Sequence, residues 1–380
     1  MGRSGIGNSA PAYNGSEMKY IAGIKRLRNF IKRAEAGEEL VLGFFGGSIT
    51  QGSLASSPEL CYAYRVFEWF RKEYPNARFH YVNAGIGGTS SHFGVSRVHR
   101  DLLMYRPDFV IVDFSVNDEP EEFFKETYEG LIRRIWYADT KPATLLLNNV
   151  FYDDGKTAQD IHNSIGQYYG IPNVSIRDTV YRRMCAGEYN RNDITPDGLH
   201  PNDVGHGLVA GEIIKAISDI KSAEVMDDYD AIEDNEKPPV TQNRFAFSTR
   251  YTIENSRPVL SGFRADASEK EGHLDNFKNG WIGKVVGDRI HFDFNNVRSI
   301  AIQYRKTVNK PAPVAVAIVD GGRNNPAPLD ANFEEDWGDC LYLQTVLNSS
   351  VKADHSLDIE IVSSTKEDKS SFYLVSIITA

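Results

Sequence analysis

The spacing of apolar residues changes near residue 220, and this change constrains the fold more than any other feature. Between residues 19 and 220, short apolar runs alternate with segments in which apolar residues recur every three to four positions. After about residue 240 they recur at every second position, as in "RIHFDF" (289–294). The first pattern predicts a parallel sheet covered by helices, and the second predicts antiparallel strands. We therefore expect two domains.

The first region reads as an α/β domain. Its apolar runs are continuous, which predicts strands buried on both faces. The predicted strands are residues 39–45, 79–85, 107–116, 143–150 and 171–176, and the predicted helices include residues 62–74, 119–138 and 203–220. Ligands bind outside the carboxyl ends of such strands, so we expect the functional residues at the junctions between strands and helices.

An acidic segment separates the two patterns. Seven acidic residues lie between Glu224 and Glu236, and Lys237 and two prolines follow them. This composition predicts an interdomain linker. The expected organisation is a polar N-terminal segment (1–18), an α/β domain (19–222), the linker (223–240) and an all-β sandwich (241–380).

Charge and composition exclude several kinds of partner. The chain has 42 Lys and Arg against 52 Asp and Glu, a net charge of −10, which disfavours nucleic acid and anionic membranes. Cys61, Cys185 and Cys340 lie far apart and read as reduced thiols. The polar start of the chain does not resemble a signal peptide, and no run reaches 18 apolar residues. A cytoplasmic protein is expected, unless a leader was removed.

Two of the predicted strands end in residues suited to bind an anion. Ser48 follows the first strand in "FFGGSITQG", where it is either an exposed hydroxyl beside a free backbone N–H or a helix N-cap. Gly85, Gly87 and Gly88 follow the second strand and allow close approach of a ligand. They could also be half of a dinucleotide fingerprint, but Ser90 stands in place of its third glycine.

Two further motifs supply polar side chains. Asn117 ends the third strand in "FSVND", where its amide either donates to an oxyanion or is an ordinary loop group. In "DGLHPND", Asp197 and His200 are three residues apart, so the carboxylate can reach an imidazole that serves as general base for a serine. A serine nucleophile needs such a base and donors aimed at the oxyanion. Every required role has a candidate on one rim.

Other catalytic motifs are not found. The sequence contains no "GxSxG", which argues against a typical α/β-hydrolase. Four other histidines show no HxxxH or HExxH spacing, so a zinc site is not expected, and His206 is read as structural. The four are His92, His99, His162 and His206.

The chain resembles SGNH (GDSL-type) hydrolases, whose four sequence blocks occur here in the same order. The blocks contain Ser48, Gly88, Asn117, and Asp197 with His200. The resemblance implies a flavodoxin-like sheet with Ser48 as nucleophile, His200 as base and Asp197 as its orienter. It also implies an oxyanion hole formed by the N–H groups of Ser48 and Gly88 and the Asn117 side chain. It implies no metal and no organic cofactor.

The resemblance covers residues 38–218 and has two departures. Gly47 stands where the family has its eponymous Asp, and Ser115 stands where a Gly usually precedes Asn117 by two positions. Neither residue bears the chemistry. The variant "GGSIT" with a β-sandwich, expected to be jelly-roll-like, resembles bacterial esterases that remove acetyl groups from plant polysaccharides. The expected function is therefore deacetylation of an acetylated sugar or oligosaccharide. The alternatives are a lipase or thioesterase and an inactive glycan-binding protein.

Trp337 is the candidate substrate-binding residue of the second domain. It lies among acidic residues in a segment (329–346) that we expect to be a long loop. It either clasps a sugar by stacking or fills the sandwich core or the domain interface, and Trp281 has the same ambiguity. The second domain then either recruits polymer or lends a loop to the active-site wall. We expect the loop, because long polar loops often carry function.

Overall fold

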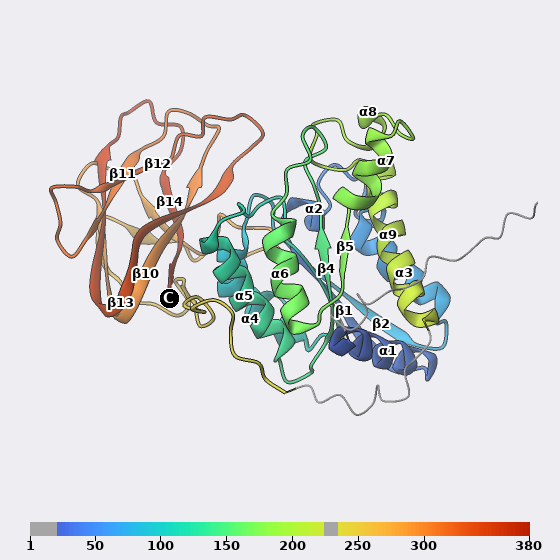
Figure 1. Ribbon diagram of the computed structural model, residues 1–380. Helices are drawn as coiled ribbons and strands as arrows, with labels where there is room; N and C mark the ends of the chain where they lie inside the picture. Colours follow the sequence, from blue (N-terminus) through green and yellow to red (C-terminus); the bar gives the residue numbers. More distant parts are fainter. Residues whose placement is uncertain (1–20, 224–234) are drawn as a thin grey trace, which may run out of the picture.

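Two sheets, one parallel and one antiparallel, organise the molecule (Figure 1). The computed structural model describes residues 21–223 and 235–380; the expected N-terminal segment (1–18) and residues 224–234 of the expected linker lie outside this range. None of the helices in the described ranges has the length and apolar character needed to cross a bilayer.

The first sheet has five parallel strands in the order β2-β1-β3-β4-β5. This order is the flavodoxin-like one, and its topological switch point lies between β1 and β3. The strands are β1 (Glu39–Gly46), β2 (Arg78–Gly85), β3 (Phe109–Asp113), β4 (Ala143–Asn148) and β5 (Asn173–Ser175). The expected α/β fold class is confirmed.

Helices cover both faces of this sheet. In β3, Phe109 and Ile111 pack on the side of α1, α3 and α9, whereas Val110 and Val112 pack on the side of α4, α5 and α6. Successive residues of the strand are therefore buried on opposite faces, which explains its continuous apolar sequence. The helices are α1 (Ile21–Glu35), α2 (Ser48–Gln51), α3 (Tyr62–Glu73), α4 (Ser91–Asp101), α5 (Glu122–Trp136), α6 (Gln159–Tyr169), α7 (Arg182–Cys185), α8 (Arg191–Ile194) and α9 (Asp203–Ser222).

The third strand is shorter than expected from residues 107–116. It ends at Asp113, because the chain turns there: the N–H groups of Asn117 and Asp118 both donate to the Phe114 carbonyl, at 3.0 and 2.9 Å. The apolar character of the next residues reflects their burial under the turn rather than strand pairing.

The second domain is all-β and its sheet is antiparallel, as expected for the C-terminal region. Its two long strands, β10 and β13, pair with each other through three register shifts. The first part of β10 pairs with β7 and the last part with β14, so the sheet folds over a shared core. The strands are β6 (Thr249–Tyr251), β7 (Val259–Ser261), β8 (Arg264–Ala265), β9 (Trp281–Gly283), β10 (Arg289–Lys306), β11 (Val314–Val319), β12 (Ala327–Asp330), β13 (Cys340–Ser363) and β14 (Phe372–Thr379).

The prediction of a long loop over residues 329–346 is wrong about its length. Strand β12 continues to Asp330 and β13 begins at Cys340, so only residues 331–339 form the loop. The start of β13 lacks clean period-two alternation because Leu341 faces the other domain rather than solvent. Trp281 is 1% exposed and packs edge-on against Phe292 in the core of the second domain.

An apolar cluster joins the two domains. Strands β10, β13 and β14 contribute one part, and the loop after β2 and helix α4 contribute the other. Its members are Ile86, Phe93, Ala301, Leu341, Tyr373, Val375 and Ile378. In Figure 1 the second domain accordingly lies beside α4 and α5. The contact is part of the folded core, since its residues are all buried.

Two buried carboxylates of α5 hold the segment that enters the second domain. Glu129 accepts hydrogen bonds from the N–H groups of Val240 (2.7 Å) and Thr241 (2.8 Å), from the Thr241 hydroxyl and from Tyr169. One turn earlier, Glu126 pairs with the guanidinium of Arg244 at 2.6 Å. These bonds order the chain between the domains.

Replacing Glu129 by alanine should destabilise the protein, because the donors that it satisfies would lose their acceptor. We expect the unfolding temperature to fall by about 2–3 °C, as judged from about 2 kcal/mol for a lost buried network in a chain of this length. Calorimetry checks this, with Glu122→Ala at an exposed position of the same helix as the control. Equal unfolding temperatures for the two variants would contradict the role of Glu129.

Candidate active site

The structure brings the residues expected from the sequence to one edge of the parallel sheet. Ser48 begins α2 directly after β1, Gly88 follows β2, and Asn117 follows β3. Asp197 and His200 lie in the loop before α9. Because the carboxyl ends of parallel strands meet at the same edge, Ser48, Gly88 and Asn117 converge at the switch point between β1 and β3. The loop before α9 reaches the same point, where His200 lies 2.8 Å from Ser48.

Ser48, His200 and Asp197 form a continuous chain of hydrogen bonds. The Ser48 Oγ lies 2.8 Å from His200 Nε2, and His200 Nδ1 lies 2.7 Å from Asp197 Oδ2. Since the carboxylate can only accept, Nδ1 carries the proton and Nε2 is free to accept the serine proton. Ser48 is 7% exposed, so its hydroxyl is at the surface of the cleft but largely shielded.

The carboxylate of Asp197 is held by its own loop. Its Oδ1 accepts from the N–H groups of Leu199 (2.9 Å) and His200 (2.8 Å) and from the Thr195 hydroxyl (3.1 Å). Partial burial acts to raise the pKa of Asp197, but the hydrogen bonds from His200 and the backbone outweigh it and lower the pKa to about 2. Asp197 is therefore an anion at neutral pH and orients the imidazole.

Three possible oxyanion donors surround Ser48. The N–H groups of Ser48 and Gly88 have no acceptor among residues 21–223 and 235–380. A methyl group added at Gly87 would lie 3.6 Å from the Ser48 Cβ, so this glycine loop passes directly beside the serine. A methyl group at Gly47 would lie 2.2 Å from Asn117 Oδ1. Glycine at position 47 thus leaves room for the Asn117 amide, which explains why no Asp stands there.

Sequence reasoning missed two residues that position this loop pair. Gln51 Oε1 accepts from the Gly87 N–H at 2.7 Å. Asp118 Oδ1 accepts from the Ser91 N–H at 2.8 Å, and its Oδ2 lies 3.0 Å from the Nε2 of the buried His162. Their position in the sequence could have indicated this role, because Gln51 lies three residues after Ser48 and Asp118 directly follows Asn117.

Trp337 reaches the active site from the second domain. Its Cη2 would lie 3.9 Å from a methyl group added at Gly88. Its ring packs edge-on against Phe333, and its Nε1 donates to Glu335 at 2.6 Å. The side chain is 57% exposed, so it is not a core residue. The loop 331–339 therefore forms part of the rim beside Gly88.

A cavity of about 200 Å³ adjoins the glycine loop and Asn117. Strands β10 and β13 close it on one side, and the α/β domain closes it on the other. Its lining is mixed, with an apolar wall and a few polar groups: Gly88, Thr89, Ser90, Phe93, Asn117, Phe124, Gln303, Leu341, Tyr342 and Leu343. Both domains thus shape the space next to the candidate oxyanion donors.

The remaining histidines and cysteines have other surroundings. His206 Nδ1 accepts from the Tyr62 N–H, and its Nε2 lies 3.2 Å from the Ser53 carbonyl; burial lowers the pKa of His206 to about 4. The cysteines are unpaired in the described ranges, and Cys185 is exposed, unlike the other two. Nowhere in these ranges are three or more His, Cys, Asp or Glu side chains grouped to hold a metal ion.

A buried carboxylate supports the turn that carries Ser48. The Asp113 carbonyl accepts from the Gly47 N–H at 3.2 Å, and its Oδ2 accepts from Thr50 (3.1 Å) and Asn149 (2.9 Å). Its Oδ1 has no partner among the described residues. Burial raises the pKa of Asp113, against the effect of these two hydrogen bonds, to about 7.

The free energy of unfolding of the wild type should decrease between about pH 4 and about pH 7 as buried Asp113 loses its proton. In Asp113→Asn this decrease should be absent. Because the folded-state pKa lies above the unfolded value of about 3.9, the protonated form favours folding, and this contribution is lost as pH rises through that window. The difference is on the order of 1.4 kcal/mol per pKa unit. Denaturant titrations at several pH values measure it, with Asp139→Asn at an exposed position as control. Parallel stability curves for Asp113→Asn and wild type would contradict it.

Comparison with known proteins places the chain in a family. The sequence pattern of the GDSL-like Lipase/Acylhydrolase family matches residues 44–208. An acetylxylan esterase from Geobacillus stearothermophilus is 23% identical over 211 residues, which cover 48% of this chain and 94% of that protein.

The similarity to one solved protein spans both domains. The crystal structure of a two-domain esterase (CEX) active on acetylated mannans, co-crystallized with mannopentaose, is 46% identical, with a TM-score of 0.89 over 94% of this chain and 95% of that chain. A second crystal structure of a two-domain esterase of the same description matches with the same identity and TM-score. The chain thus belongs to the GDSL-like lipase/acylhydrolase family and is a carboxylic ester hydrolase.

Proposed function

We propose that this protein is a serine esterase that removes O-acetyl groups from oligosaccharides or polysaccharides through an acyl-enzyme. The observation that carries the proposal is the hydrogen-bonded chain from Ser48 through His200 to Asp197, beside three possible oxyanion donors. The substrate class is supported by the similarity, along both domains, to an esterase described as active on acetylated mannans.

In the acylation step, His200 acts first as a base and then as an acid. His200 Nε2 takes the hydroxyl proton as the Ser48 Oγ attacks the acetyl carbonyl carbon, and the carbonyl electrons move onto the oxygen. The N–H groups of Ser48 and Gly88 and the Asn117 amide donate to this oxyanion. When the tetrahedral intermediate collapses, the C–O bond to the sugar breaks and His200 returns the proton to the sugar oxygen. Asp197 stabilises the imidazolium between these two proton transfers.

Deacylation repeats the sequence with water. His200 removes a proton from a water molecule that attacks the acetyl-Ser48 ester, and the same donors stabilise the second oxyanion. Collapse breaks the bond between the acetyl carbon and the Ser48 Oγ, which recovers its proton from His200. Acetate leaves and the free enzyme is restored.

The carbohydrate part of the substrate has a candidate binding surface on the second domain. The indole of Trp337 is exposed beside Gly88 and can stack on a sugar ring, while Glu335 and its neighbours can bond sugar hydroxyls. The cavity of about 200 Å³ next to Gly88 and Asn117 suits a small acyl group. These features favour a carbohydrate acetyl esterase over a lipase, and the bonded triad disfavours an inactive glycan-binding protein.

Loss of the nucleophile should abolish turnover, whereas loss of one donor should only reduce it. We expect Ser48→Ala and His200→Ala each to lower kcat for a small chromogenic acetate by about 10⁴-fold or more. Asn117→Ala should lower kcat by about 10²- to 10³-fold. Circular dichroism verifies folding, and Ser164→Ala on α6 serves as a serine control. Wild-type activity in Ser48→Ala would eliminate this serine as the nucleophile.

Trp337→Ala should weaken the use of an acetylated mannan oligosaccharide. Loss of an aromatic contact worth about 0.5–1.5 kcal/mol should raise KM about 2- to 12-fold, with little change in turnover of a small acetate. Trp337→Phe keeps an aromatic ring and should raise KM less than Trp337→Ala does. Val351→Ala, at another exposed position of the second domain, is the control. Unchanged oligosaccharide kinetics in Trp337→Ala would show that this indole does not bind the substrate.

A further inference from the structure

The fold contains a second histidine–aspartate pair, which is fully buried. His162 Nε2, on α6, lies 3.0 Å from Asp118 Oδ2, and the side chains of both residues are 0% exposed. Because a carboxylate can only accept, Nε2 carries the proton. The other ring nitrogen, Nδ1, has no hydrogen-bond partner within residues 21–223 and 235–380. Unlike His200, His162 therefore holds no hydroxyl group, and its burial prevents contact with a substrate.

Asp118 connects the two loops that carry candidate oxyanion donors. It follows Asn117 in one tight turn, where the N–H groups of both residues donate to the Phe114 carbonyl. Its Oδ1 accepts from the N–H of Ser91 at 2.8 Å. Ser91 is the first residue of α4 and lies three residues after Gly88. One carboxylate thus sets the distance between the turn that carries Asn117 and the loop that carries Gly88.

Helix α4 is the fixed side of this connection. The buried guanidinium of Arg97, in the middle of the helix, donates to the carbonyls of Ala84 (2.7 Å) and Gly46 (3.0 Å). These carbonyls lie at the ends of β2 and β1, the strands that lead to Gly88 and Ser48. The helix is therefore tied to the same sheet edge as the nucleophile.

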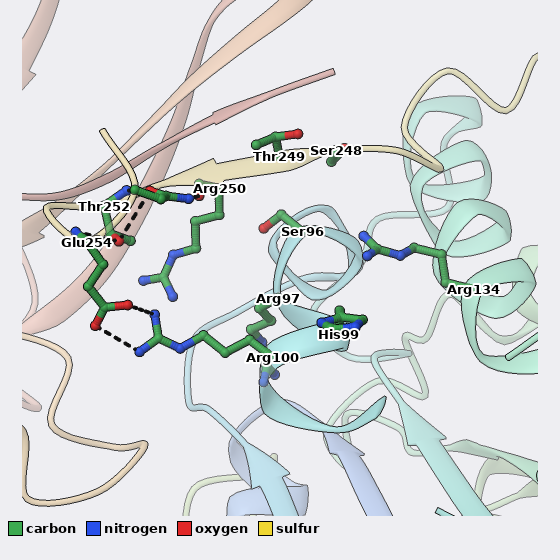
Figure 2. Close-up of a pocket in the computed structure, with 11 residues that line it drawn as sticks. Ser96, Arg97, His99, Arg100, Arg134, Ser248, Thr249, Arg250, Thr252 and Glu254 are labelled. Carbon is green, nitrogen blue, oxygen red and sulfur yellow. Dashed lines mark hydrogen bonds and ion pairs between the residues drawn. The ribbon is translucent and has the colours of Figure 1, made fainter. Parts of the chain in front are cut away.

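The C-terminal end of α4 is also tied to the second domain. A cavity of about 430 Å³ lies there between α4, α5 and β6 (Figure 2). Arg100 forms a bidentate pair with Glu254 at 2.8 and 3.1 Å, which Figure 2 draws with dashed lines. A change at Asp118 should therefore displace the turn that carries Asn117 rather than α4. We call this space the basic cavity, because four arginines line it: Arg97, Arg100, Arg134 and Arg250.

His162 holds the Asp118 carboxylate in the orientation that bonds Ser91. Its ring is itself fixed by parallel stacking on Tyr128 of α5, with 3.6 Å between the ring centroids and 8° between the planes. Without the Nε2–H donor, Asp118 Oδ2 would be a buried acceptor without this partner, which favours rotation or protonation of the carboxyl group. Either change weakens the bond to the Ser91 N–H and loosens the turn that carries Asn117.

We propose that His162 is a positioning residue of the ester-hydrolysing site. Through Asp118, it fixes the Asn117 amide relative to the Gly88 N–H. This inference rests on the proposed function, because it assumes that Asn117 stabilises the oxyanion. Oxyanion donors act in the transition state rather than on the bound substrate, so a displaced Asn117 lowers kcat and leaves KM nearly unchanged.

Two substitutions of His162 differ mainly in the hydrogen-bond donor. Met and Gln side chains are similar in length and volume, but only Gln has an N–H group, about as far from the backbone as the histidine Nε2. We expect His162→Met to lower kcat for a small chromogenic acetate about 10- to 100-fold, the cost of a displacement of about 1 Å near the reacting atoms. His162→Gln should recover most of this loss. His92→Met, which replaces a buried imidazole packed on Phe123 and Phe245, is the control and should keep the wild-type kcat.

A double-mutant cycle with Asn117→Ala separates positioning from a general effect on the fold. If His162 acts through Asn117, His162→Met should lower kcat by no more than about twofold once Asn117 is alanine. Calorimetry verifies that each variant is folded at the assay temperature. Should His162→Met not fold, Asp118→Ala takes its place in the cycle, because it breaks the same link at its other end.

The inference is overturned by a wild-type kcat in His162→Met, by equal losses in the Met and Gln variants, or by a raised KM with unchanged kcat. An effect of His162→Met that is equally large with and without the Asn117 amide also overturns it. These results leave the proposed function intact as long as Asn117→Ala alone is slow. A wild-type kcat in Asn117→Ala would instead remove both the oxyanion role of Asn117 and the positioning role of His162.

Discussion

The two-sided burial of strands β10 and β14 is the constraint on which the rest of the structure depends. One face of these strands, with Ile302 and Leu374, lies in the core of the second domain. The opposite face, with Ala301 and Val375, packs on the loop after β2 and on α4. A sheet that buries both faces cannot slide or detach without exposing apolar surface to water. The second domain is therefore fixed beside the active-site edge of the parallel sheet.

This fixed contact has consequences on both sides of the interface. It sets the start of β13 and the loop 331–339 beside Gly88, so that Trp337 stands next to a candidate oxyanion donor. It also encloses the basic cavity that includes Arg134 and Arg250, which neither domain would form alone. Glu126 and Glu129 add polar bonds that hold the connecting segment to α5. The rim of the candidate active site and the cavity between α4, α5 and β6 thus depend on the same contact between the domains.

The sequence was most informative where local pattern and topology agree. The convergence of Ser48, Gly88 and Asn117 could be predicted because each follows a buried parallel strand, and such strands end at one edge. Asp197 and His200 could be paired because they are three residues apart in one loop. The sequence left Trp337 open between a sugar contact, the sandwich core and the domain interface, because its position depends on a docking contact between distant segments. The cavity lined by Arg134 and Arg250 could not be predicted either, because its lining residues come from distant parts of the chain.

The identity of the nucleophile is tested most directly by trapping the acyl-enzyme. Wild-type protein mixed with a chromogenic acetate is quenched in acid within the first turnover, and intact mass and peptide mapping then locate any added acetyl group. An acetyl group on the peptide that carries Ser48, together with a burst of released alcohol equal to the enzyme concentration, is the predicted result. An acetyl group on another residue, with Ser48 unmodified, would contradict the proposed mechanism.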